Sequence, residues 1–162
     1  MSKVIVVFGS TTGVTEDVAG RIASKLGATA IPVSDFNADV IAASDALVLG
    51  SSTWGCGELQ DDWYDGVELL KSSNLAGKKV AVFGCGDSSS YSDTFCDAMS
   101  IIAKAAADAG ATLVGKVSTD GYTFDSSASA SDGQFVGLAI DEVNESDKTD
   151  ARIDAWVASL GL

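Results

Sequence analysis

The chain has 162 residues, of which 46% are hydrophobic and 20% are charged, and this composition is typical of one globular domain and excludes a disordered chain. Twenty-three acidic residues against ten basic ones give a formal net charge of −13, which disfavours nucleic acids and anionic membrane surfaces as partners. Histidine is absent, and its absence excludes Ser-His-Asp and Cys-His catalytic arrangements.

The first half of the chain alternates short apolar runs with helical periodicity. Apolar runs without polar alternation predict strands buried on both faces, at residues 4–8, 29–33 and 46–49. Between the first two runs, Val14, Val18, Ile22 and Leu26 recur every four residues and predict a helix that ends at Gly27. The acidic segment 61–70 is expected to form a second helix.

The second half continues this alternation and then breaks it. Strands are predicted at 80–83 and 112–117, separated by a helix whose buried face is Phe95, Met99, Ile102, Ala103 and Ala106. A polar stretch, 118–134, follows before an apolar run resumes at 135–139. We interpret the stretch as an insertion that interrupts the fifth strand, and its aromatic residues favour a folded excursion over a free linker. A last helix carries Ile153, Trp156, Val157 and Leu160, with Thr149 as its expected N-cap.

This order of elements predicts the fold class. Strands that alternate with helices indicate an α/β protein, a doubly wound five-stranded parallel sheet with helices on both faces, in a single domain over residues 1–162. Open parallel sheets bind ligands beyond the carboxyl ends of their strands, where the strand order reverses. The loops after strands one, three and four are therefore the candidate site.

The first of these loops is rich in hydroxyl groups and glycine. It reads Gly9-Ser10-Thr11-Thr12-Gly13-Val14-Thr15 and joins a buried strand to a helix. Backbone N–H groups and a helix N-terminus favour a phosphate there. The loop has no Lys, so it is not a nucleotide-triphosphate loop. A plain Ser/Thr-rich turn that caps the helix is an equally good interpretation of this loop alone.

The other two loops each carry one aromatic residue among small ones. Trp54 precedes Gly55-Cys56-Gly57, and Tyr91 follows the run that begins at Gly84. An aromatic side chain at the end of a strand is well placed to stack on a planar ligand, although Trp54 folding back over its own loop is the alternative. A phosphate cradle and two aromatic faces together predict a flavin mononucleotide (FMN) site.

These residues give the sequence a resemblance to the flavodoxins that extends over the whole chain. Residues 135–142 and 146–149 resemble the C-terminal stretch of the long-chain flavodoxins. The resemblance implies that FMN is held by residues of all three loops: Ser10, Thr11, Thr12, Gly13, Val14 and Thr15; Ser52, Thr53, Trp54, Gly55, Cys56 and Gly57; and Cys85, Gly86, Asp87 and Tyr91. The resemblance also implies that Trp54 covers the inner flavin face, that Tyr91 covers the outer face and that Asp87 contacts the pyrimidine edge. Val14 and Gly55-Cys56 depart from the usual family residues.

The resemblance implies a low-potential one-electron carrier rather than an enzyme, with tightly but non-covalently bound FMN and no metal. The carrier would shuttle between semiquinone and hydroquinone. We expect the peptide between Gly55 and Cys56 to turn its carbonyl toward flavin N5 in the semiquinone, because glycine tolerates positive φ. Nearby carboxylates should lower the potential of the second electron.

An acidic cluster follows the Trp54 loop and suggests how partners dock. Its members are Glu58, Asp61, Asp62, Asp65 and Glu68, with no basic residue among them. A solvated helix face is the alternative interpretation. The resemblance implies transient docking on basic redox proteins such as ferredoxin–NADP⁺ reductase and, in phototrophs, photosystem I. We expect a monomer with no membrane insertion.

Other proteins with this fold offer two alternative functions, and the cysteines and the N-terminus predict where the protein is located. An FMN-dependent NAD(P)H:quinone reductase on the same fold is the alternative function, whereas a phosphorylated receiver domain is disfavoured because Gly9-Ser10 and Gly50-Ser51 replace its acidic residues. Cys56, Cys85 and Cys96 are expected to be free thiols in a reducing compartment. The short apolar run after Lys3 lacks a signal-peptide cleavage site, so we expect a cytoplasmic protein.

Overall fold

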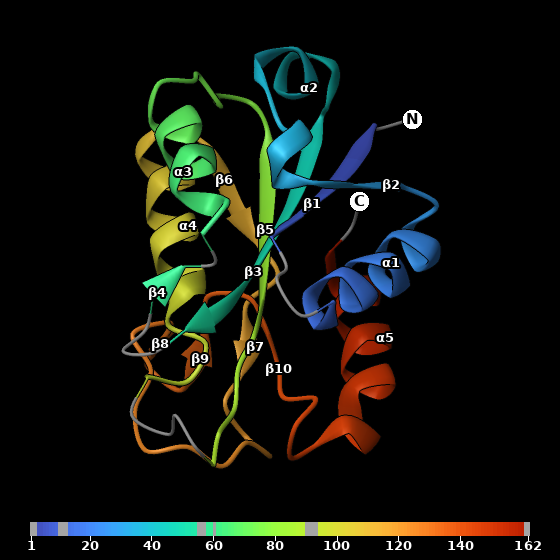
Figure 1. Cartoon of the computed structure of the whole chain (residues 1–162), viewed down its shortest axis with the longest axis vertical. Coiled ribbons are helices and arrows are strands. Elements are labelled where there is room, and N and C mark those ends of the chain that lie inside the picture. The colour runs from blue at the N-terminus through green and yellow to red at the C-terminus, as the bar shows by residue number, and fades with distance from the viewer. Residues whose placement is uncertain (1–2, 10–12, 55–57, 60, 90–93, 161–162) are drawn as a thin grey trace.

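A parallel sheet forms the centre of the molecule, and helices cover both of its faces (Figure 1). The computed structural model describes residues 3–9, 13–54, 58–59, 61–89 and 94–160. The main path of the sheet has the order β10-β5-β3-β1-β2. Its strands are β1 (Val4–Gly9), β2 (Thr29–Pro32), β3 (Ala46–Trp54), β5 (Lys79–Cys85) and β10 (Leu138–Ile140), and all of these pairings are parallel. The expected doubly wound α/β fold is therefore confirmed.

The fifth position of the sheet is shared by two short strands, as the sequence predicted for an interrupted strand. β6 (Thr112–Val114) pairs with the first residues of β5, and β10 pairs with its last three. Gly137 lies just before β10 in close contact with β5. A Cβ at this position would stand 1.9 Å from the Val82 carbonyl oxygen, so only glycine lets the second half of the strand return this close to β5.

The four longest helices cover the sheet in two pairs (Figure 1). α1 (Val14–Leu26) and α5 (Thr149–Leu160) lie on one face, whereas α3 (Trp63–Lys71) and α4 (Ala98–Asp108) lie on the other. Neighbouring residues of one strand enter opposite cores: Val6 packs under α1 and α5, and Val7 packs toward α3 and α4. This two-sided burial explains the continuous apolar runs in the sequence.

The segment between β6 and β10 folds into its own small antiparallel sheet. The order of that sheet is β7-β9-β8, from β7 (Val117–Ser118), β8 (Ala130–Ser131) and β9 (Gln134–Phe135). The Phe135 ring of β9 packs with those of Phe95, Tyr122 and Phe124, and the centroids of the contacting rings are 4.9 to 6.2 Å apart. The expectation of a folded excursion is confirmed.

The structure corrects several predicted boundaries. The fifth strand ends at Val114 rather than at residue 117 and resumes at Leu138 rather than at residue 135, because Val117 and Phe135 pair with each other. α4 begins at Ala98, after Phe95. Thr149 is the first residue of α5, and its Oγ1 has no hydrogen-bond partner among the described residues, so the predicted N-cap is wrong.

Four further short elements were not predicted from the sequence. They are α2 (Ala38–Ala43), β4 (Glu58–Leu59) and the 3₁₀ turns η1 (Val33–Asp35) and η3 (Ser146–Lys148). α2 begins at Asn37, whose Oδ1 accepts a hydrogen bond from the Val40 amide at 3.0 Å. In the part of the chain that is described, no helix is long and apolar enough to cross a membrane.

Candidate functional site

The carboxyl ends of β1, β3 and β5 meet at one edge of the sheet. Gly9 of β1 is in register with Ser51 of β3, and Ser52 of β3 is in register with Cys85 of β5. The chain leaves β1 toward β2 on one side and later adds β3 on the other side, so the strand order reverses between β1 and β3. The three loops singled out in the sequence therefore begin side by side at this reversal.

The first loop leads into α1 with a buried hydroxyl group. Gly13 precedes the helix at φ 90°, a left-handed conformation that favours glycine, and Val14 is 39% exposed. Thr15 is 1% exposed, and its Oγ1 has no hydrogen-bond partner among the nitrogen and oxygen atoms of the described residues. The Cys85 thiol lies beside it, but a thiol is a weak hydrogen-bonding group. A buried hydroxyl with no stronger partner costs free energy, which indicates that a ligand or a neighbouring loop completes it. Ser10, Thr11 and Thr12 lie outside the described residues.

The second loop starts at the end of β3, which folds back on itself. Trp54 pairs with Glu58 of β4 in antiparallel register, and Gly55, Cys56 and Gly57 lie outside the described residues. Ser52 Oγ is buried and has no hydrogen-bond partner in the described part of the chain. It is the second such hydroxyl at the edge where β1 and β3 end.

Thr53 has a structural contact of its own. Its Oγ1 accepts a hydrogen bond from the Ala98 amide at 3.1 Å, so this hydroxyl oxygen satisfies an amide at the start of α4. Contact between Thr53 and a ligand at this edge would therefore come from its main chain or its hydroxyl proton.

The third loop follows β5 and is held by several hydrogen bonds. The Gly86 amide donates to the Ile140 carbonyl at 2.9 Å. Asp87 Oδ1 accepts hydrogen bonds from the Ser89 amide at 3.0 Å and from Asn144 Nδ2 at 2.8 Å. Tyr91 lies outside the described residues. The loop after β10, which the sequence analysis did not single out, thus contributes to this site.

Two of the three cysteines are buried free thiols. Burial raises the pKa of Cys85 to about 12, although the Thr15 hydroxyl beside it acts in the opposite direction. Burial likewise raises the pKa of Cys96 well above its ordinary value. Both groups remain protonated near neutral pH, and this state fits packing rather than thiol chemistry. The expectation of free thiols is confirmed for these two, and Cys56 lies outside the described residues.

The acidic cluster lies mainly on and before α3. Trp63 is fully buried, and its Nε1 donates to the Gly50 carbonyl at 2.6 Å, which holds the start of α3 against β3. Asp61, Asp65 and Glu68 are exposed, and Glu68 lies 3.5 Å from Lys71 in an ion pair. The part of the cluster at residues 61–68 therefore borders the edge where the three loops begin, with its charges facing solvent.

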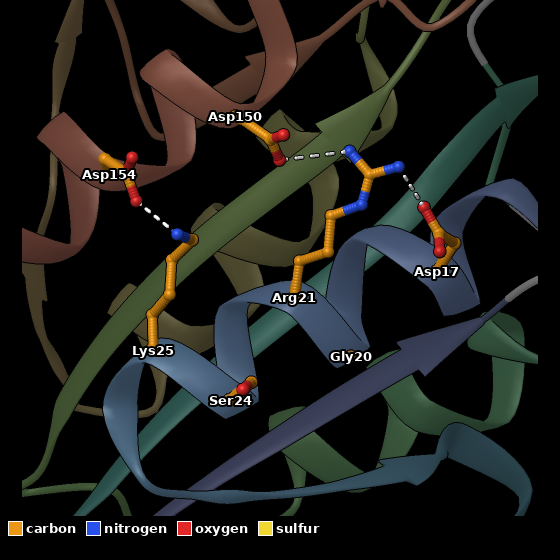
Figure 2. Close-up of a pocket in the computed structure, with 7 residues that line it drawn as sticks. All are labelled: Asp17, Gly20, Arg21, Ser24, Lys25, Asp150 and Asp154. Carbon is orange, nitrogen blue, oxygen red and sulfur yellow. Dashed lines mark hydrogen bonds and ion pairs between the residues drawn. The ribbon is translucent and has the colours of Figure 1, made fainter.

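A groove of about 640 Å³ lies between α1 and α5 (Figure 2). Arg21 contacts Asp17 at 2.7 Å and Asp150 at 3.4 Å, and Lys25 pairs with Asp154. Both cations that line the groove are thus in ion pairs within it. This arrangement is typical of a salt-bridged contact between helices rather than of an anion site.

Comparison with known proteins yields one family. A family model described as flavodoxin matches residues 6–156. A flavodoxin of Synechococcus elongatus is 42% identical and one of Nostoc sp. (strain PCC 7120) is 44% identical, each match covering 99% of this chain and 96% of the relative. Among solved structures, Fusobacterium nucleatum flavodoxin bound to flavin mononucleotide has a TM-score of 0.91 and 25% identity, covering 98% of this chain and 96% of that one.

Proposed function

This chain belongs to the flavodoxin family, and from that premise we propose that it binds FMN non-covalently and carries single electrons between redox proteins. We assign this role to one FMN-binding domain that spans residues 1–162. The proposal makes the protein a carrier rather than an enzyme. A reducing, cytoplasmic setting is in keeping with the free thiols of Cys85 and Cys96.

The observation that carries the proposal is a pair of buried hydroxyl groups at the edge where the strand order reverses. Among the described residues, Ser52 Oγ is buried without a hydrogen-bond partner, and the buried Thr15 Oγ1 has only the weakly hydrogen-bonding Cys85 thiol beside it. They come from the loops that the resemblance assigns to the phosphate and to the flavin ring. A phosphate ester and a polar ring edge are groups that satisfy such hydroxyls. The residues present therefore fit FMN.

The proposed contacts divide among the three loops. Ser10, Thr11, Thr12, Gly13 and Thr15 would hold the phosphate, with Val14 contributing its main chain. The other two loops would hold the ring, through Ser52, Thr53, Trp54, Gly55, Cys56, Gly57, Cys85, Gly86, Asp87 and Tyr91. Thr53 and Cys85 would act mainly through their backbone, because the Thr53 hydroxyl oxygen contacts α4 and the Cys85 thiol is buried.

When bound, FMN supplies a group that accepts and releases electrons one at a time. The protein chain contributes electrostatic repulsion and the exclusion of water. A carboxylate about 10 Å from a negative charge, at an effective dielectric of about 20, opposes it by roughly 1.7 kcal/mol. That energy corresponds to about 70 mV for a one-electron step. Asp61, Asp62 and Asp65 would thus lower the potential of the second electron, while Trp54 and Tyr91 would exclude water from the ring.

We further propose that partners dock transiently on the acidic cluster. Basic redox proteins such as ferredoxin–NADP⁺ reductase, and photosystem I in a phototroph, are the partners that the family resemblance suggests. The exposure of Asp61, Asp65 and Glu68 beside the site supports this role. Such contacts need no stable oligomer, so the protein is proposed to act as a monomer.

Titration of the apoprotein with FMN and with riboflavin tests the binding proposal. Thr15→Val removes the buried hydroxyl with little change in volume, and we expect it to lower the affinity for FMN by about tenfold. Riboflavin lacks the phosphate, so its affinity should change by less than about twofold. Thr29→Val, on an exposed residue at the amino end of β2, is the matched control. Failure of the wild-type apoprotein to bind FMN would contradict the proposal.

A further inference from the structure

Asp141 is fully buried directly after β10, where two loops come together. Ile140 of β10 is in register with Cys85 of β5, and the Gly86 amide donates to the Ile140 carbonyl at 2.9 Å. Residues 86–89 and Asp141 therefore leave the sheet side by side. They do so at the same edge as the buried hydroxyls of Thr15 and Ser52.

The carboxylate of Asp141 accepts hydrogen bonds from two segments of the chain. Oδ1 accepts hydrogen bonds from the amides of Val143 at 3.2 Å and Asn144 at 2.9 Å, which closes the turn of its own loop. Oδ2 accepts from the Ser88 amide at 3.1 Å and from the Ser88 hydroxyl at 2.5 Å. A local turn needs only the first oxygen. Only the second oxygen accepts hydrogen bonds from Ser88, 53 residues away in the sequence.

Asn144 extends the same network to a second carboxylate. Its Nδ2 donates to Asp87 Oδ1 at 2.8 Å and to Asp141 Oδ2 at 3.0 Å. The Ser89 amide also donates to Asp87 Oδ1, at 3.0 Å. Asp87 and Ser88 are thus both tied to the loop after β10. Asp87 is the residue that the family resemblance assigns to the pyrimidine edge of the flavin.

We infer that Asp141 is a positioning residue for the flavin ring, acting through Ser88 and, with Asn144, through Asp87; the inference rests on the FMN site proposed above. A buried carboxylate is costly unless its oxygens accept hydrogen bonds, so Asp141 strongly favours the loop conformation that supplies these donors. A loop already held in its binding conformation loses less entropy when the ligand binds. Asp141 therefore raises affinity for the ring without contacting the phosphate.

Asp141→Asn separates the two tasks of the carboxylate. The amide keeps one oxygen for the local turn, but its NH₂ group cannot accept the Ser88 hydrogen bonds. In fluorescence titrations of the apoprotein, we expect the affinities for FMN and for riboflavin to fall by the same factor, about 10- to 100-fold. Glu142→Gln is the control. It removes a neighbouring charge that contacts Arg21 at 3.3 Å, and we expect it to change neither affinity by more than about twofold.

A second variant keeps the inference testable if Asp141→Asn does not fold. Ser88→Ala removes only the hydroxyl donor, so we expect both affinities to fall by about three- to tenfold. The double variant should bind no more weakly than Asp141→Asn alone, because both changes break one network. Far-UV circular dichroism of each apoprotein establishes whether it is folded.

The outcomes separate the inference from the function on which it rests. If the wild-type apoprotein does not bind FMN, the proposed function itself is wrong. If the wild-type apoprotein binds FMN and a folded Asp141→Asn variant binds it with unchanged affinity, the inference alone is overturned. If Asp141→Asn does not fold, an unchanged affinity in Ser88→Ala overturns it. Weaker FMN binding with riboflavin affinity retained would also overturn it, because the effect would then lie at the phosphate.

Discussion

Glu145 and Arg152 form an ion pair that joins three segments of the chain. It accepts hydrogen bonds from Lys148 Nζ at 2.8 Å and from both terminal nitrogens of Arg152 at 3.1 Å. Arg152 in turn lies 3.8 Å from the centre of the Tyr122 ring and donates to the Gly121 carbonyl at 3.1 Å. The loop after β10, α5 and the folded excursion therefore meet at the pair formed by Glu145 and Arg152.

Stability in acid should report the contribution of Glu145. The hydrogen bond from Lys148, followed by the charge of Arg152, lowers the pKa of Glu145 below its ordinary value of 4.5. A carboxyl group whose pKa is lowered by folding stabilises the protein above its unfolded pKa, and this contribution is lost as the pH falls through the folded pKa. We expect Glu145→Gln to reduce the free energy of unfolding in urea at pH 7 and to have a smaller effect at about pH 3.

The exposed neighbour Asp147 provides the control for this experiment. Asp147→Asn removes an equal charge from the same turn, and we expect it to change stability by less than about 0.5 kcal/mol at pH 7. Equal destabilisation by Glu145→Gln at both pH values would show that its hydrogen bonds, rather than its charge, carry the effect.

Among the elements, the buried strands and long helices were predictable, whereas the short pieces were not. Val6 and Val7 enter different cores, and such runs can be recognised without knowing the partners. α2 has one buried residue, Ile41, and so gives no periodic stripe. Val117 and Phe135 each resemble part of a strand next to β5, but they pair with each other. Local pattern does not distinguish these two pairings.

The position of the candidate site was predictable from the sequence, but one of its buried residues was not. Gly13, Thr15 and Ser52 lie at the expected edge, because parallel strands bring their carboxyl ends together. Asp141 was missed because it gains its role only from contact with Ser88, far away in the sequence. An aspartate directly after an apolar strand was its one available signal. Ser10, Thr11, Thr12, Gly55, Cys56, Gly57 and Tyr91 lie outside the described residues and stay predictions.

Gly137 tests how tightly β10 must approach β5. Its added Cβ would meet the Val82 carbonyl oxygen at 1.9 Å and Val82 Cγ2 at 2.6 Å. Backbone cannot move aside as a flexible side chain can, so we expect Gly137→Ala to lower the free energy of unfolding by about 2–4 kcal/mol. Gly20→Ala is the matched control, because a Cβ there meets nothing within 4 Å and alanine favours the helix by about 1 kcal/mol. Equal stability of both variants in chemical denaturation would contradict the close approach.

Across the whole molecule, the net charge of −13 is expected to determine partner choice. Asp61→Lys with Asp65→Lys reverses two exposed charges beside the site. We expect association with ferredoxin–NADP⁺ reductase to slow by about tenfold at low ionic strength and by much less at high salt, because salt screens the attraction. Stopped-flow kinetics measure this rate.

A control pair with the same change in net charge shows whether position matters. Asp39→Lys with Asp108→Lys alters α2 and the end of α4, away from the carboxyl edge of the sheet. We expect this pair to slow association less than the first pair does. Equal slowing by both pairs would indicate that net charge alone steers the partner and would contradict docking at the acidic cluster.

The central claim is that this molecule holds FMN and passes electrons singly. Anaerobic reduction of the purified protein, followed by its visible spectrum, tests the claim most directly. We predict the absorption of bound FMN and two resolved one-electron steps, the second at the lower potential. A protein that carries no FMN and does not take it up, or one whose flavin is reduced in a single two-electron step, would contradict the claim.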